Sequence, residues 1–146
     1  MKETLRRAAG IVAWKPGSDG PLFLLLKNAH HGTWGFAKGH LEPGESELEG
    51  AAREFEEETG LEAPPLVDGF RIETEHRHRR EDRQILKVVA YFLAASSSSG
   101  EVKISAEHDA VLWADEAMAR QTLQFDSLRR VITAAVQALG GSLPDE

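Results

Sequence analysis

The sequence of 146 residues contains no cysteine. This absence excludes disulfide bonds and zinc sites built from thiolates, and it fits a cytoplasmic protein. No apolar run approaches the ~20 residues that a transmembrane helix needs. The first residues, Met1 to Arg7, are not followed by the long apolar segment of a signal peptide. We therefore expect a cytoplasmic protein that does not associate with membranes.

Basic residues are also in short supply. There are 17 Lys and Arg against 24 Asp and Glu, so the formal net charge is -7. Such a balance disfavours broad electrostatic binding to extended nucleic acid. If this protein handles a polyphosphate, it needs cations and a local basic pocket.

Apolar patterning predicts one α/β domain over residues 1–146, a length that can bury a substantial core. Runs bounded by turn residues predict strands at 8–14, 22–26, 66–75, 84–95 and 111–114. Helices are expected from Ser46 to Gly60, from Asp115 to Arg120 and over 126–139, with a Ser/Gly loop at 96–100. Helices interspersed with strands indicate an α/β/α sandwich around a mixed sheet.

The helix expected after Ser46 has clear start and stop signals. Ser46 with Glu49 three residues later forms a capping box, and Gly60 is a typical end. Its inward face should contain five residues at helical spacing: Leu48, Ala51, Ala52, Phe55 and Thr59.

Three carboxylates, Glu54, Glu57 and Glu58, lie three and four residues apart on this helix. Those spacings place them on one face, where like charges repel. A hard divalent cation such as Mg²⁺ would relieve the repulsion and accept oxygen ligands. The Gly/Pro loop at 39–44 leads into the helix and can bring backbone groups close to a metal or a phosphate.

The segment from Gly39 to Leu61 resembles the signature of the Nudix hydrolase family. Its fixed positions are Gly39, Glu45, the Arg53-Glu54 pair, the Glu57-Glu58 pair and Gly60, with Phe55 and Leu61 at the two apolar positions. The resemblance implies the Nudix fold, hydrolysis of a phosphoanhydride, and Mg²⁺ or Mn²⁺ as cofactor. Nine constrained positions make chance agreement very improbable.

The resemblance also implies roles for individual residues. Glu57 and Glu58 are the first choice as metal ligands, together with the Gly39 carbonyl. Glu54 is either a further ligand or the general base, and Glu107, outside the motif, is the second candidate base and a further ligand. Arg53 is expected to point off the metal face and to hold Glu45 and its loop against the helix.

Residues around the motif narrow the resemblance to the asymmetrical diadenosine tetraphosphate hydrolases. The Lys38-Gly39-His40 form, an upstream Trp34 and looser matches along the chain carry this similarity. It implies cleavage of diadenosine tetraphosphate to ATP and AMP. Expected contacts to phosphates or base come from five residues: Lys38, His40, Lys87, Tyr91 and Phe125.

Two other functions also remain possible interpretations of the sequence. Another Nudix substrate is one: the 5′ end of RNA, a modified nucleoside triphosphate, ADP-ribose or a diphosphoinositol polyphosphate. A module that binds nucleotide without turnover is another. The basic cluster from Arg77 to Arg83, within a charged loop or hairpin end expected at 76–83, is either a solvated tip or a phosphate clamp.

Overall fold

The computed structural model describes residues 2–96 and 100–140. The strands are β1 (Lys2–Gly17), β2 (Gly20–Asn28), β3 (Trp34–Gly35), β4 (Ala37–His40), β5 (Ile72–Arg80), β6 (Arg83–Ala95) and β7 (His108–Ala114). The helices are α1 (Glu47–Thr59), α2 (Glu116–Thr122) and α3 (Asp126–Ala138). No helix within the described ranges is both long enough and apolar enough to cross a bilayer.

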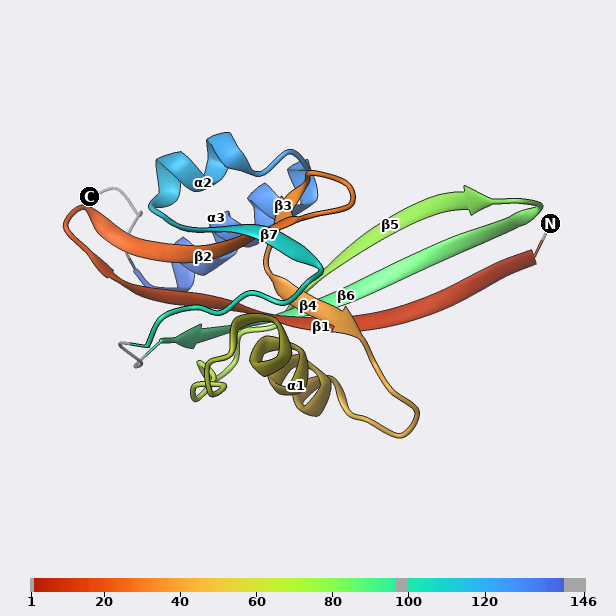
Figure 1. Ribbon diagram of the computed structural model, residues 1–146, viewed down its shortest axis with the longest axis horizontal. Helices are drawn as coiled ribbons and strands as arrows, with labels where there is room; N and C mark the ends of the chain where they lie inside the picture. The colour runs from red at the N-terminus through yellow and green to blue at the C-terminus, as the bar shows by residue number, and fades with distance from the viewer. Residues whose placement is uncertain (1, 97–99, 141–146) are drawn as a thin grey trace.

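The seven strands form one mixed sheet with helices on both faces (Figure 1). Its main path runs β3-β2-β1-β6-β5, while β4 pairs with β1 and β7 pairs with β2. The β1–β6 pairing is parallel and the others are antiparallel. The expected α/β/α sandwich is confirmed.

Two apolar cores lie on opposite faces of the sheet, because successive strand residues alternate between faces. On one face, Val12, Tyr91 and Leu93 pack with helices α2 and α3. On the other, Ile11 and Phe92 pack with Phe55 of helix α1. The candidate site lies beside strand β4, between the helices that cover the two faces.

Helix α1 begins and ends as the sequence predicts. The Ser46 side chain accepts a hydrogen bond from the Glu49 backbone N–H, and the Glu49 side chain accepts one from the Ser46 N–H. Gly60 ends the helix in the left-handed conformation, at φ 72°. One inward residue was predicted wrongly: Leu48 is 52% exposed, because the face that the helix buries is formed by Gly50, Ala51, Phe55, Glu58 and Thr59.

The largest difference from the expected elements lies in β5. The predicted strand 66–75 is displaced, since Leu66 makes only an isolated bridge with Ala94 and β5 begins at Ile72. The expected loop at 76–83 is strand up to Arg80, and only Glu81 and Asp82 form the turn. Cross-strand pairing with β6 overrides the weak strand propensity of these charged residues.

The extended β5–β6 hairpin and the start of β1 project from the body as a three-stranded arm (Figure 1).

Two further predictions concern the start of helix α2 and the loop at 96–100. The Asp115 side chain caps α2 by accepting from the Met118 N–H. The Ser/Gly loop predicted at 96–100 falls mostly on residues 97–99, outside the described residues.

Candidate active site

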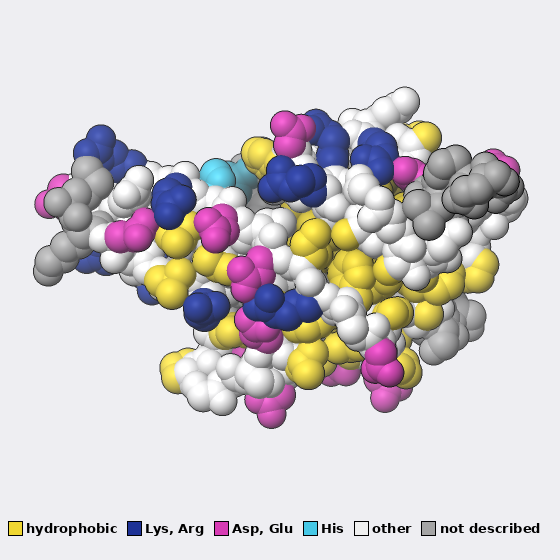
Figure 2. Space-filling model, turned by 180° about the vertical axis from the view of Figure 1, so that it is seen from behind, with side chains coloured by type: hydrophobic (Ala, Val, Ile, Leu, Met, Phe, Trp, Pro, Cys, Tyr) yellow, Lys and Arg dark blue, Asp and Glu magenta, His cyan; other side chains and the backbone are white. Residues whose placement is uncertain are grey.

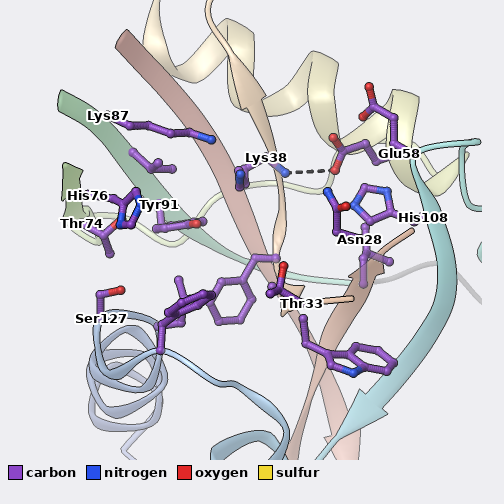
Figure 3. A pocket seen from close by; sticks show the side chains of 18 residues that line it. Asn28, Thr33, Lys38, Glu58, Thr74, His76, Lys87, Tyr91, His108 and Ser127 are labelled. Carbon is purple, nitrogen blue, oxygen red and sulfur yellow. Dashed lines mark hydrogen bonds between the residues drawn. The ribbon is translucent and has the colours of Figure 1, made fainter. Parts of the chain in front are cut away.

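A cleft beside strand β4 consists of two adjoining cavities, of about 280 and 550 Å³. Five residues line both: Asn28, Lys38, Glu58, Lys87 and Glu107. Figure 3 shows Glu58 on one side of β4 and Lys87 on the other, with Lys38 between them. The larger cavity extends toward acidic groups of helix α1, and the smaller one extends toward aromatic residues under α3.

The acidic end brings together three of the predicted carboxylates, Glu54, Glu58 and Glu107. Glu58 is only 4% exposed and accepts a hydrogen bond of 3.1 Å from the Lys38 backbone N–H. Burial, and then the neighbouring charges of Glu54 and Glu107, raise the pKa of Glu58 to about 8. Without a cation, this carboxyl therefore holds its proton at neutral pH.

Glu107 reaches the helix from the loop before β7, almost fifty residues further along the chain. Its backbone carbonyl accepts a hydrogen bond of 2.9 Å from the Ala29 N–H, which ties this loop to the loop after β2. Asn28 shapes that second loop, since its side-chain oxygen accepts from the backbone N–H groups of His30 and His31. Backbone contacts between two loops thus place Glu107.

Gly39 lies directly against the carboxylate of Glu54. A Cβ added to Gly39 would overlap all three atoms of that carboxylate group. The glycine therefore allows the close approach between strand β4 and helix α1.

Arg53 holds the loop before the helix in place. Its Nε and Nη2 donate to the two oxygens of Glu45, at 2.7 and 2.9 Å, and Nη2 also donates to the His40 carbonyl at 3.0 Å. This bidentate pair lowers the pKa of Glu45 to about 2, with help from the Glu42 backbone N–H. The expected Arg53–Glu45 pair is present in the structure.

The expectation that Arg53 points off the metal face is wrong. Its Nη1 donates to Glu54 at 2.9 Å and to Glu57 at 3.3 Å. The planar guanidinium has five N–H donors along its edges. The edge with Nε and Nη2 can therefore hold Glu45 while Nη1 reaches the helix carboxylates. Arg53 therefore partly offsets the repulsion between these glutamates.

Glu57 does not line either cavity. Its side chain is 58% exposed and pairs with Arg53, whereas the Glu54 side chain is 14% exposed. The helical spacing does place Glu57 next to its two neighbours, but on the solvent side of them. Its predicted role as a ligand stays a prediction.

The basic part of the cleft contains Lys38, Lys87 and His40. Burial and the nearby Lys38 charge lower the pKa of Lys87 to about 8. The pKa of His40 is also lowered, by partial burial and then by Lys87, Lys38 and Arg6. These groups together can bind a polyanion.

Gly10 of β1 makes room for this arrangement. It pairs with Lys38, and a Cβ at Gly10 would overlap the Lys38 side chain and approach the Ala37 carbonyl. An isolated glycine within an apolar strand pattern was the available signal, which sequence reasoning did not use.

The other end of the cleft is aromatic. Trp34, Phe36, Tyr91 and Phe125 all line the smaller cavity. Tyr91 packs edge-on against Phe36, with ring centroids 5.4 Å apart, and is only 2% exposed. Tyr91 is thus mainly a core residue that forms part of the cavity wall.

Phe125 is 47% exposed and lies at the N-cap of helix α3. The preceding Gln124 holds this corner by accepting a hydrogen bond from the Trp34 N–H and donating one to the Gly32 carbonyl. The exposed ring beside a cavity can stack on a base.

Several lining residues were missed from the sequence. The wall of the smaller cavity also includes Asn28, Thr74, His76, His108 and Ser127 (Figure 3). The His108 Nδ1 is buried without a hydrogen-bond partner in the described chain, and burial lowers the pKa of His108. No local pattern marks these residues, because four separate segments contribute them.

The acidic end fits a hard divalent cation. Its donors are carboxylate oxygens, and the raised pKa of Glu58 reports the crowding of negative charge that a cation would relieve. In the described ranges, no three His, Cys, Asp or Glu side chains already converge as a set of ligands. The carboxylates would therefore have to close around the cation.

Comparisons with known proteins agree with these features. The family model described as the NUDIX domain matches residues 4–135. The rat protein "Bis(5'-nucleosyl)-tetraphosphatase [asymmetrical]" is 36% identical, with 91% of this chain and 95% of the rat protein covered. A Mycolicibacterium smegmatis 8-oxo-(d)GTP phosphatase is 33% identical, covering 90% of this chain but 41% of that protein.

The fold also has solved counterparts. A crystal structure of a C. elegans Ap4A hydrolase binary complex superposes with a TM-score of 0.85 at 24% identity, covering 93% of this chain and 98% of that one.

Proposed function

The chain belongs to the Nudix hydrolase family, and we propose that it hydrolyses a phosphoanhydride bond of dinucleoside polyphosphates. The proposed reaction is attack of water on phosphorus in diadenosine tetraphosphate, giving ATP and AMP. The observation that carries the proposal is the order of groups in one cleft. Carboxylates, lysines and an exposed aromatic ring follow one another along the cleft. This is the order in which a cation, the phosphate chain and a base of the substrate would be bound.

Glu54, Glu58 and Glu107, with the Gly39 carbonyl, would hold Mg²⁺ or Mn²⁺. Glu57 would join them by leaving its pair with Arg53. Such a cation neutralises phosphate charge and activates water. Because Glu58 is protonated near neutral pH in the metal-free protein, it must release its proton when a cation binds.

Either Glu54 or Glu107 serves as the general base in this proposal. Both line the larger cavity beside Glu58, so both are within the region where the attacking water would be held. Arg53 holds Glu54 through a hydrogen bond and thereby restricts its orientation. Glu107 has greater freedom, because it is held through its backbone.

Lys38, Lys87 and His40 would bind the phosphate chain. A phosphate between the two lysines would offset their mutual repulsion and would raise the lowered pKa of Lys87, which favours its charged form. Phe125 would stack on the base. The cation and substrate would be the small-molecule partners of this protein, and a cytoplasmic location remains our prediction.

The test is a product analysis. The protein is incubated with diadenosine tetraphosphate and Mg²⁺, with and without chelator, and the nucleotides are separated. ATP plus AMP only in the presence of metal is the expected result. Two ADP would mean cleavage at the centre of the phosphate chain and would contradict the proposed register.

A second candidate is hydrolysis of a nucleoside triphosphate, which the similarity to the 8-oxo-(d)GTP phosphatase favours. A panel of nucleoside triphosphates, ADP-ribose and diphosphoinositol polyphosphates distinguishes it from the first. Binding without turnover across the whole panel would identify a nucleotide-binding module instead.

A further inference from the structure

Strand β5 is an edge strand of the sheet along the whole arm. Its nine residues pair with β6 on one side, and no strand of the described chain pairs with the other side. The last six of them, 75–80, are all exposed, and Figure 1 shows β5 at the border of the arm. An exposed edge of this length presents backbone N–H and C=O groups that can pair with a further strand.

The hairpin turn determines which backbone groups point to the free edge. Arg80 and Arg83 pair across the two-residue turn at 81–82. Residues next to such a turn exchange backbone hydrogen bonds, and pairs with and without such bonds alternate along an antiparallel ladder. Even-numbered residues of β5 therefore point their N–H and C=O groups at β6. The groups that point to the free edge belong to the four odd-numbered residues: Glu73, Glu75, Arg77 and Arg79.

Opposite charges occupy the two halves of this strand. The half nearer the body carries Glu73 and Glu75, and the half nearer the turn carries Arg77 and Arg79. The four side chains share one face, because alternate residues of a strand point the same way. Figure 2 shows Lys and Arg side chains gathered at the free end of the arm, at the left of the view. Such a strand is complementary in charge to an antiparallel copy of itself.

Charge also selects the register of such a pairing. When two copies of β5 are centred on His76, Glu75 lies opposite the partner's Arg77, and Glu73 lies opposite the partner's Arg79. Centring on Glu75 instead would oppose two copies of Glu75, and centring on Arg77 would oppose two copies of Arg77. Like charges directly opposite one another are destabilising. Of these three centres, His76 alone opposes unlike charges at every outward residue.

Glu75 and Arg77 can each bind a further charged group. Glu75 is exposed and forms no ion pair with another described residue. The Arg77 side chain is 54% exposed, and its Nε donates to Glu3 at 3.3 Å. The guanidinium has five N–H donors, so it can hold Glu3 and a carboxylate of a second copy at once.

We propose that this protein forms a homodimer in which β5 pairs antiparallel with β5 of a second copy, centred on His76. The twofold axis makes each contact occur twice, as in any isologous interface. Four outward residues on each strand allow about eight backbone hydrogen bonds. The dimer joins two sheets into one, and it goes beyond the proposed function because no substrate takes part in it.

The second copy also borders the cleft in this dimer. Thr74 and His76 line the smaller cavity, and the register sets Thr74 opposite the partner's His78. Adjacent strands lie about 4.8 Å apart, so the partner's strand follows the rim of this cavity. Directly opposite residues share a face of the sheet, so both clefts open on the same face of the dimer.

The experiment is sedimentation velocity of the full chain over a series of concentrations. Wild type should shift from monomer to dimer as its concentration rises. Glu75→Arg opposes a positive charge to the partner's Arg77, and Arg77→Glu opposes a negative charge to the partner's Glu75. Each variant alone should raise the dissociation constant of the dimer by roughly tenfold or more, because symmetry applies each repulsion twice.

Mixing the two variants provides the sharpest result. In the mixed dimer, two basic residues of one copy meet two acidic residues of the other at positions 75 and 77. Equal amounts of the two variants should therefore form dimers about as tightly as wild type does. Recovery on mixing also shows that both variants are folded.

Two charge reversals away from the free edge serve as matched controls. Glu62→Arg changes an exposed residue beyond helix α1, and Arg83→Glu changes a residue of the inner strand β6. Neither position faces the second copy across the edge, so both controls should keep the dissociation constant of wild type.

Three outcomes would overturn the inference. A wild type that stays monomeric at every concentration would do so and would leave the proposed function untouched. Dimers that persist unchanged in both variants would assign the contact to another surface. Dissociation of each variant without recovery on mixing would contradict the pairing of Glu75 with the partner's Arg77, and with it the register.

Discussion

The two sides of the cleft carry opposite charges but share one physical condition. On the α1 side, burial and neighbouring carboxylates raise the pKa of Glu58 to about 8. On the β4–β6 side, burial and a neighbouring lysine lower the pKa of Lys87 to about 8. Each side crowds like charges in partly desolvated surroundings, so each is relieved by a ligand of the opposite sign.

The difference lies in how each side is built. The acidic side is local except for Glu107, since one helix supplies Glu54 and Glu58, and Arg53 already offsets part of their charge. The basic side needs two strands, and no carboxylate in the described ranges forms an ion pair with Lys38 or Lys87. We therefore expect changes on the acidic side to affect chemistry most, and changes on the basic side to affect substrate binding.

The largest expected effect follows from Glu58→Gln. Loss of this ligand should reduce kcat by roughly 10²–10⁴ with the fold intact, because both cation binding and water activation depend on it. Glu57→Gln should also reduce kcat, if Glu57 leaves Arg53 for the cation. Steady-state kinetics and circular dichroism of both variants check this, and wild-type kcat for Glu57→Gln would remove Glu57 from the metal site.

The second effect concerns the metal-free protein. The pKa of Glu58 is about 8 in the folded protein, above the usual 4.5. The raised pKa therefore contributes stability that is fully present below pH 4.5 and is lost as the pH rises toward 8. Glu58→Gln removes this titration. In chelator, the variant should exceed wild type in free energy of unfolding by on the order of 1–3 kcal/mol at pH 8, and the gap should shrink at pH 5.

Urea denaturation at both pH values measures that gap. A constant gap between pH 5 and pH 8 would contradict the raised pKa and the crowding of the acidic side.

On the basic side, Lys38→Ala should lower kcat/KM by roughly 10- to 100-fold through loss of one phosphate contact. The Lys38 backbone N–H remains, so its hydrogen bond to Glu58 is kept. The pKa of Lys87 should rise from about 8 toward its usual value, because the neighbouring charge is gone. Kinetics and an NMR titration of Lys87 check both results, and unchanged values would remove Lys38 from the cleft.

The smallest expected effect is that of Arg53→Ala. Its side chain is 23% exposed and links Glu45, Glu54 and the His40 carbonyl. Loss of these bonds should reduce stability by about 1–2 kcal/mol and should reduce kcat as well. A melting temperature equal to that of wild type would count against the structural role.

Local sequence determined helix α1 and its motif. Ser46, Glu49 and Gly60 set the bounds of the helix through contacts within a few residues, and such contacts can be read along the chain. The spacing of Glu54 and Glu58 likewise fixes their common face. The Arg53–Glu45 pair spans eight residues and was also predictable.

Only the tertiary structure decided what lies opposite this helix. Glu107 joins the carboxylates through a backbone bond between two loops, Gly10 gives Lys38 its space, and cross-strand pairing carries the arm to Arg80. It also decided that Glu57 faces solvent and that Tyr91 is buried. Periodicity specifies which residues share a face of one element, whereas burial and charge pairing depend on the elements that pack against that face.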